Sequence, residues 1–450
     1  MEQKINKQSF QDINTTTILK KFNKILKDKK DKKDKKDKKD KKDKKDKKET
    51  KETKKEIQKK PINSFSSLSI SKSEDLKLSI NVNGKYTHII EFIFAKTDLE
   101  QWTYQDIYKL LSSTSQNSNC MIDIMMYTKT YAAFIHIDKG KHEIVEISPQ
   151  SFFNEKTFQN FIKIVKKNQK EKKMNYNYNL NSIFVFGGHC NGWKCYTDDY
   201  IVDFEMIYNT FIKNNMKFNA ICFDCCYTST FELLYQFHDL TDYIIAHQSY
   251  VYGNGFNTRN LSKIFDVNIS FIEQLIILCM DYLVRTIDEN EFSNFTIINT
   301  YFFKDFLKLF KENYKSILDI IHNKKSKQFL SDVCNKCMTS SSISMPYDTQ
   351  TKYTEPSIYN NMLDLYSVIK IFNNKKMIEL YNKSVLYREN DINKDEKYFN
   401  KKMKLYGINI IIIPPLLSSI SSPSFHHKLK NKNLDQYYLN LRFFKDFLVK

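Results

Sequence analysis

The sequence of 450 residues lacks several features that would assign it to a common class. It has no run of 18 uncharged apolar residues, because Glu273 and Asp281 interrupt the stretch 271–284 and Pro414 ends the isoleucine run at Ile410. We therefore expect no membrane-spanning helix. The first residues contain no apolar core of a secretory signal, so we expect an intracellular protein without a signal peptide.

Glycine and proline are also scarce, with 8 and 7 residues, while lysine, asparagine, isoleucine, phenylalanine and tyrosine are abundant. This bias is typical of AT-rich coding, so the lysine excess by itself indicates no function. Where glycine is scarce, its clustering marks tight turns or a close approach to a ligand. Three of the eight glycines stand at 187, 188 and 192.

Nine cysteines, an odd number, in a chain without a secretion signal favour free thiols in a reducing compartment over a disulfide framework. The pairs Cys222-x-x-Cys225 and Cys334-x-x-Cys337 have the spacing of zinc ligands. They lie far apart in the sequence and the first falls on a predicted core strand, so we expect no metal. Cys195 shows no signal beyond ordinary packing.

The net charge of +19 is concentrated at the amino terminus, since residues 1–60 carry 25 basic and 12 acidic side chains. Asp-Lys-Lys repeats seven times within 28–48, a period that fits neither helix nor strand. We predict that residues 1–84 form a disordered, solvated tail. Contact of this tail with nucleic acid or another polyanion stays open, although no aromatic residues interleave with the lysines for stacking on single strands.

The rest of the chain, with 41% apolar residues overall, is long enough to form a sizeable core. Strand and helix patterns alternate over 85–257, which predicts an α/β core with a mainly parallel sheet flanked by helices. The segment 258–405 is expected to be a mostly helical addition, and 406–450 a strand at 407–413 that returns to the sheet, followed by a helix. The expected strands of the core are 88–95, 121–127, 131–137, 182–187, 218–223 and 243–247, and the expected helices are 104–112, 151–167, 203–214 and 229–237.

Two apolar runs end in reactive side chains. The segment 182–193 runs into His189, and the segment 218–226 runs into Cys225 and Cys226. The carboxyl ends of neighbouring parallel strands meet at one edge of a sheet, where open α/β folds place their chemistry. An imidazole there supplies the base that a thiol needs to become a nucleophile.

These segments resemble the clostripain family of cysteine peptidases, which has the caspase-like fold shared with gingipains and legumain. His189-Cys190-Asn191-Gly192-Trp193 is similar to the family's His-Gly-x-Gly-Trp turn, and Phe223-Asp224-Cys225-Cys226 to its Phe-Asp-Ala-Cys. Weaker matches follow in the same order over about 85–450, namely Asp98-Leu99-Glu100, Gly253-Asn254-Gly255-Phe256, Met362 to Ser367, Gly407 to Pro414 and Tyr437 to Leu448.

The resemblance implies that Cys226 is the nucleophile and His189 the general base, with no cofactor. Cys225 is the competing nucleophile, disfavoured by the motif register. Gly188 and Cys190 belong to the turn expected to contribute to the oxyanion hole, although Cys190 replaces a glycine and its side chain restricts the backbone.

The resemblance also implies a pocket for a basic P1 side chain, the substrate residue before the scissile bond. Asp224 is expected to line it, or else to cap a turn. Gln248 and Asn254 occupy substrate-binding positions where relatives have acids, as does Ser249. Loss of these carboxylates weakens the expected preference for basic residues.

The function expected is that of a cysteine endopeptidase acting on a peptide or protein substrate through a thioester intermediate. The alternative is a catalytically inactive caspase-like scaffold, which the changes at positions 190, 248, 249 and 254 favour. A third alternative is a protein that acts mainly by binding nucleic acid through its tail. The sequence predicts no oligomeric state.

Overall fold

The chain divides into two units, 1–79 and 80–450, and every residue that the structure describes lies in the second. The computed structural model describes residues 86–113, 120–129, 132–138, 141–147, 154–176, 180–191, 194–196, 201–248, 251, 255–256, 270–288, 294–322, 362–390, 407–411 and 441–447. The predicted tail 1–84 lies outside the described residues.

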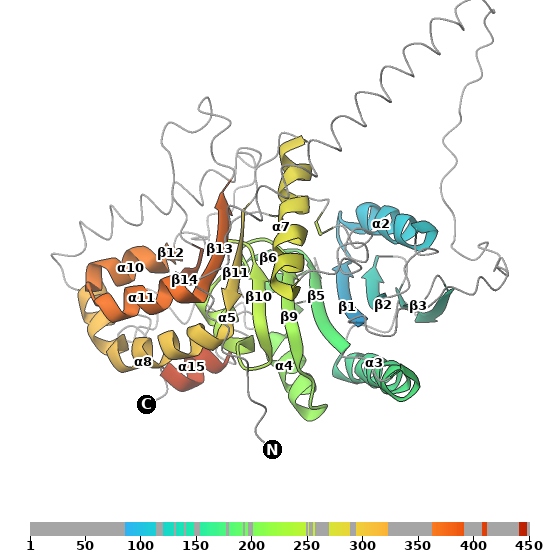
Figure 1. Ribbon diagram of the computed structural model, residues 1–450, viewed down its shortest axis with the longest axis horizontal. Coiled ribbons are helices and arrows are strands. Elements are labelled where there is room, and N and C mark those ends of the chain that lie inside the picture. Colours follow the sequence, from blue (N-terminus) through green and yellow to red (C-terminus); the bar gives the residue numbers. More distant parts are fainter. Residues whose placement is uncertain are drawn as a thin grey trace, which may run out of the picture. The chain divides into compact units, whose positions relative to one another are not determined.

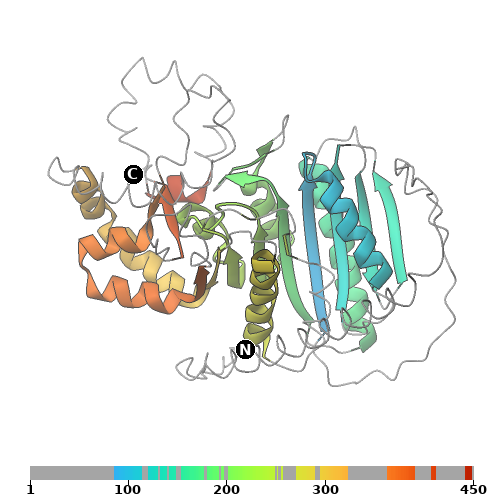
Figure 2. The same cartoon turned by 90° about the horizontal axis from the view of Figure 1, so that it is seen from above.

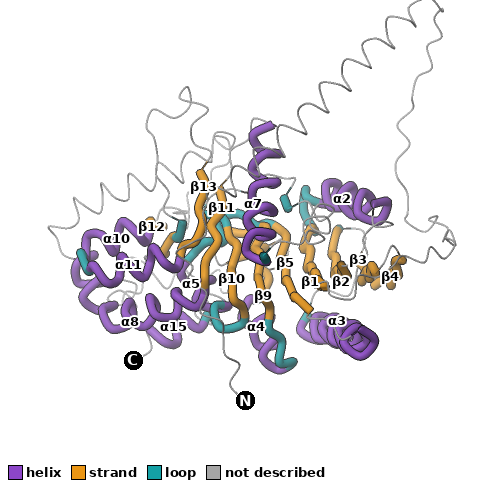
Figure 3. Tube along the Cα trace, in the orientation of Figure 1, coloured by secondary structure: helices purple, strands orange, loops and turns teal. Residues whose placement is uncertain are grey.

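A nine-stranded sheet forms the centre of this unit, in the order β13-β11-β10-β9-β5-β1-β2-β3-β4 (Figure 3). The five central strands are parallel, and the two at each edge are antiparallel. These central strands are rich in β-branched and aromatic residues and are buried on both faces, as expected for parallel strands. In chain order they are β1 (Tyr86–Ala95), β2 (Cys120–Thr128), β5 (Leu180–Gly188), β9 (Phe218–Asp224) and β10 (Thr241–Ala246).

Helices cover both faces of the sheet (Figures 1 and 2). On one face, α3 (Glu155–Tyr176) and α4 (Phe204–Lys213) pack phenylalanine side chains against the strands. The ring centroids of Phe158 and Phe92 are 5.7 Å apart, and those of Phe211 and Phe184 are 5.0 Å apart. The opposite face is covered by α2 (Glu100–Ser113) and α7 (Phe271–Asp288). The predicted α/β class, with a mainly parallel sheet flanked by helices, is confirmed.

The part of the chain after 257 contributes strands as well as helices. The predicted helices appear as α7 and α8 (Thr300–His322), and α10 (Leu365–Phe372) and α11 (Lys375–Ser384) follow. However, β11 (Asn294–Asn299) and β13 (Val385–Asn390) extend the main sheet. The helical prediction missed these two strands because they are short runs between longer helical patterns.

The predicted return of 407–413 to the sheet is wrong. Asn409–Ile411 forms β14, which pairs with β12 (Met362–Asp364) in a separate two-stranded sheet. The last helix, α15 (Arg442–Phe447), packs on α5 (Phe231–Phe237), and the Arg442 guanidinium donates to both carboxylate oxygens of Asp239. Among the described residues after 406, β14 thus pairs outside the main sheet and α15 packs on α5.

Two further features were not predicted. The edge strand β4 (Lys141–Ile147) pairs with β3 (Ala132–Asp138), and its charged, exposed face explains why no apolar pattern marked it. A small antiparallel sheet contains β6 (Cys190–Asn191), β7 (Lys194–Tyr196) and β8 (Ile201–Val202).

None of the described helices is long and apolar enough to cross a membrane.

Candidate active site

Two adjacent parallel strands, β5 and β9, direct the two predicted catalytic residues into one pocket. In chain order, β1 is followed by β2 on one side and β5 on the other, so the strand order reverses at β1. Such switch points open a crevice at the carboxyl ends of the strands. His189 follows β5 and Cys226 follows β9, and both line a cavity of about 290 Å³ that also includes Gly187, Gly188 and Asp224.

The ring of His189 is held by an acid from the neighbouring strand end. Its Nε2 lies 2.6 Å from Oδ1 of Asp98, which follows β1. The hydrogen bond to His189 is the largest cause that lowers the pKa of Asp98, so the carboxylate stays ionised and can only accept. The sequence analysis gave Asp98 no role in the site. The signal that could have indicated one is its position as an acid shortly after the end of the first strand.

The thiol of Cys226 is partly buried at the pocket wall. Its sulfur accepts a hydrogen bond from the backbone N–H of Val251 at 3.3 Å and lies 3.6 Å from the Val251 carbonyl oxygen. Burial raises the pKa of Cys226 to about 11, although the Val251 N–H partly offsets this effect. At neutral pH, a base must therefore take its proton before it can act as a nucleophile.

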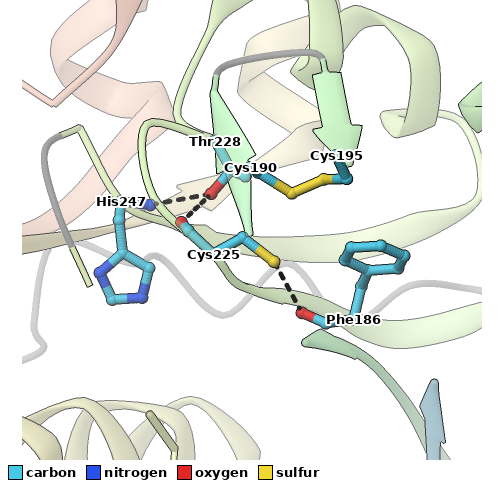
Figure 4. Close-up of a disulfide and its surroundings, with 6 residues drawn as sticks. All are labelled: Phe186, Cys190, Cys195, Cys225, Thr228 and His247. Carbon is cyan, nitrogen blue, oxygen red and sulfur yellow. Dashed lines mark hydrogen bonds between the residues drawn. A yellow bond between two sulfur atoms is a disulfide. The ribbon is translucent and has the colours of Figure 1, made fainter. Parts of the chain in front are cut away.

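Cys225 lies in a different environment from its neighbour. It is 1% exposed, and its thiol donates a hydrogen bond to the Phe186 carbonyl oxygen at 3.4 Å (Figure 4). Burial raises the pKa of Cys225 well above its ordinary value. Of the two adjacent cysteines, Cys226 is the one that lines the pocket.

A sharp turn separates Cys226 from the next helix. Tyr227 adopts a left-handed conformation with φ 57°, which is uncommon for a bulky residue and marks a constrained turn. Thr228 stabilises the turn through its hydroxyl, which donates to the Cys225 carbonyl oxygen at 3.0 Å and accepts from the His247 backbone N–H at 3.4 Å (Figure 4).

Asp224 both lines the pocket and holds a loop. Its Oδ2 accepts a hydrogen bond from the Phe256 backbone N–H at 2.6 Å. The preceding residue, Gly255, has φ +40°, and a Cβ there would lie 2.3 Å from the same oxygen. Only glycine allows this approach, so the two roles considered for Asp224, pocket lining and turn stabilisation, coexist.

The other predicted substrate-binding residues are not found in the described lining of the pocket. Gln248 is 3% exposed, and its amide donates to Asp364 at 3.0 Å and accepts from the Gly407 backbone N–H at 2.7 Å. Gln248 is not among the residues that line the pocket, and it ties the segment after β10 to the β12–β14 sheet. Asn254 and Ser249 lie outside the described residues.

The pocket contains acids that the sequence did not identify. Glu91 on β1 and Asp106 on α2 line it together with Asp98 and Asp224, and the half-exposed Trp102 adds an aromatic surface. The side chains of Glu91 and Asp106 come from strand and helix interiors, so their convergence is visible only in the folded chain.

The turn after His189 contains a disulfide. Cys190 in β6 and Cys195 in β7 are cross-strand partners, and they are bonded to each other (Figure 4). The expectation that these cysteines are free thiols is wrong, because folding places the two side chains opposite each other on a hairpin. Cys190 lies in an extended strand, which accommodates a side chain. At Gly188, by contrast, a Cβ would lie 2.9 Å from the Phe94 carbonyl oxygen.

Solved structures with a similar fold are cysteine proteases. A secreted C11 cysteine protease from Bacteroides thetaiotaomicron, in complex with an irreversible peptide inhibitor, is 13% identical with a TM-score of 0.51. The similarity covers 80% of this chain and 99% of that one. An inactive zymogen C11 protease from Parabacteroides distasonis is 14% identical with a TM-score of 0.50, over 82% of this chain and 99% of that one.

The chain has a clostripain-like fold. No protein-family model and no curated protein matches the sequence. The clostripain-like fold confirms the architecture that the two central motifs predicted, whereas the roles of individual residues rest on the geometry of the pocket.

Proposed function

We propose that this protein is a cysteine endopeptidase in which Cys226 is the nucleophile and His189 the general base and acid. The observation that carries this proposal is the shared pocket, in which a cysteine and a histidine from adjacent parallel strand ends meet beside an acid bonded to the histidine. The similarity to C11 cysteine proteases supports the same class of reaction.

The orientation of the His189 ring fits the role of a base. The ionised Asp98 accepts from Nε2, so Nε2 carries the proton of the neutral ring and Nδ1 keeps a lone pair. Nδ1 would take the proton of Cys226 as the sulfur attacks the substrate carbonyl carbon. The resulting imidazolium would then donate that proton to the leaving amine, and water would hydrolyse the thioester.

Substrate preference for a basic P1 side chain is supported by the acids of the pocket. Asp224, Glu91 and Asp106 place negative charge around the cavity and compensate for the acids absent at 248 and 249. A desolvated lysine or arginine side chain requires such neighbours. A peptide library varied at P1 should show faster cleavage after lysine or arginine than after neutral residues of similar size.

Covalent labelling tests the assignment directly. A peptide electrophile with a basic P1 residue should modify Cys226, as read by mass spectrometry, and Cys226→Ala should remain unlabelled. Cys225→Ala is the matched control and should still be labelled at Cys226. An adduct on Cys225 in the wild-type protein would overturn the register of the motif.

The raised pKa of Cys226 favours one alternative, a noncatalytic scaffold with the same fold. Turnover of the best library peptide separates the two possibilities. Wild type should exceed Cys226→Ala by several orders of magnitude, whereas equal rates would support the scaffold.

A further inference from the structure

Three cysteine sulfur atoms that the proposed mechanism does not use lie together beside the pocket. Those of Cys190, Cys195 and Cys225 are all within 4.8 Å of one another, and all three residues are buried. Cys190 and Cys195 form a disulfide, while Cys225 is a free thiol. A thiol this close to a disulfide is in reach of both of its sulfur atoms.

The positions of the three residues connect this cluster to both proposed catalytic groups. Cys190 directly follows His189, and Cys225 directly precedes Cys226. The strand that contains Cys190 has two residues and, among the described strands, pairs with β7, to which the disulfide cross-links it. A change in the bonding of these three sulfur atoms would therefore act on the backbone next to His189.

We propose that Cys190, Cys195 and Cys225 form a thiol–disulfide exchange site that sets the position of His189. In the exchange step, the Cys225 thiolate attacks the Cys190 sulfur. A Cys225–Cys190 bond forms, the Cys190–Cys195 bond breaks, and Cys195 leaves as a thiolate that takes up the proton lost by Cys225. No oxidant is consumed. A dithiol reductant would instead convert the resting disulfide to two thiols and would itself be oxidised to a disulfide.

Burial makes the exchange slow, because the attacking thiol must first ionise. The pKa of Cys225 is raised by burial, although a backbone hydrogen bond from Gly188 lowers it. The resting disulfide is 4% and 1% exposed at its two residues, so a reductant reaches it only when the hairpin opens. We expect reduction over minutes to hours, the range of uncatalysed disulfide rearrangement.

Disulfide mapping tests the exchange without any measurement of activity. In Cys195→Ala, hydroxyethyl disulfide should first form a mixed disulfide at Cys190 or Cys225. The other thiol should then displace mercaptoethanol and leave a Cys190–Cys225 bond detectable in peptide masses. The double variant Cys195→Ala/Cys225→Ala is the control and should stop at the mixed disulfide on Cys190. A Cys195→Ala protein that also stops there would overturn the proposal.

The effect on catalysis rests on the proposed function and is measured separately. Reduction of the wild-type disulfide by dithiothreitol should lower kcat/KM by about threefold or more, because His189 loses its restraint. Cys195→Ser should have the lower value from the start and should not respond to dithiothreitol. Equal kcat/KM in the oxidised and reduced wild type would overturn the link to His189.

Two further results would separate failure of the proposed function from failure of the exchange site. If no form of the protein cleaves peptides, the proposed function fails, while the disulfide map still decides the exchange. Stoichiometric zinc retained by the reduced wild type, and lost in Cys225→Ala, would assign the three thiols to a metal and overturn the exchange.

Discussion

At the scale of single residues, the proposed chemistry depends on the contact between His189 and Asp98. Asp98 is 84% exposed, and yet its carboxylate approaches Nε2 at 2.6 Å. An exposed polar contact of this kind contributes little to stability, so in the proposed mechanism its value lies in fixing the tautomer and angle of the ring. In the proposed mechanism Asp98 is therefore a positioning residue, which would act on the reaction through His189.

The substitution Asp98→Asn should lower kcat by roughly tenfold to hundredfold and leave KM nearly unchanged, because the amide no longer fixes the tautomer that makes Nδ1 the acceptor. Steady-state kinetics would measure this split between kcat and KM. Asp305→Asn, an exposed aspartate on α8, is the control. Equal losses in both variants, or a loss confined to KM, would contradict the positioning role.

The reactivity of Cys226 should reveal whether His189 takes its proton. In His189→Ala, the rate of Cys226 alkylation should keep rising with pH towards about 11, because burial holds the thiol in its protonated form. In the wild type the rate should level off at a lower pH, since the imidazole shares the proton. Alkylation by iodoacetamide followed by peptide mass spectrometry gives both profiles. Superimposable curves would show that His189 does not assist Cys226.

At the scale of elements, one loop after β10 completes the pocket by backbone contacts. Gly255 and Phe256 approach the carboxylate of Asp224, and Val251 contacts the sulfur of Cys226. The described residues of this loop thus contact both Cys226, the proposed nucleophile, and Asp224. Its conformation depends on a positive φ that only glycine adopts at little cost.

The substitution Gly255→Ala should displace the Asp224 carboxylate, because the added Cβ would overlap Oδ2 and the residue would be strained. We expect a loss of about 1–3 kcal/mol of unfolding free energy, together with a weaker preference for basic P1 residues. Thermal unfolding and the P1 library measure the two effects. Gly187→Ala is the matched control for stability, since its Cβ meets nothing within 4 Å. Similar unfolding temperatures for both variants would contradict the predicted overlap.

At the scale of the whole described unit, a second polar cluster ties three strands together away from the pocket. Asp123 on β2 lies 2.8 Å from His88 Nε2 on β1 and 2.6 Å from His136 Nδ1 on β3, and it accepts from Asn168 on α3. The histidine hydrogen bonds outweigh the desolvation of Asp123 and lower its pKa to about 2. For His136, desolvation acts to lower the pKa, but the opposing contact with Asp123 raises it overall.

These shifts predict a stability optimum in mildly acidic solution. The contribution of ionised Asp123 is present above its ordinary pKa of 3.8 and is lost as the pH falls towards 2. The contribution of protonated His136 is present below its ordinary pKa of 6.5 and is lost as the pH rises through its higher folded value. Urea unfolding across this range should show both declines.

The variant Asp123→Asn should flatten the profile and lower the maximum by about 2 kcal/mol, the equivalent of the Asp123 shift. Asp305→Asn should keep the wild-type shape. A profile for Asp123→Asn parallel to that of the wild type would show that other groups cause the pH dependence.

The sequence by itself determined the central α/β alternation and the two reactive strand ends. Buried parallel strands read as continuous apolar runs, and a strand must end where His189 or Cys226 leaves the apolar core. Such local patterns depend on neighbouring residues in the chain. They therefore predicted β5 and β9 within a few residues, and placed both reactive residues at one edge of the sheet.

Only the tertiary structure decided which distant residues meet there. Asp98 reaches His189 because β1 pairs with β5, and Cys195 bonds to Cys190 because a hairpin places them opposite each other. Nothing in the sequence around Gln248 indicates whether its amide is buried in the core or faces the pocket. Residues 409–411 pair with β12 and not with the main sheet, because strand pairing depends on segments far apart in the chain, which local periodicity does not resolve.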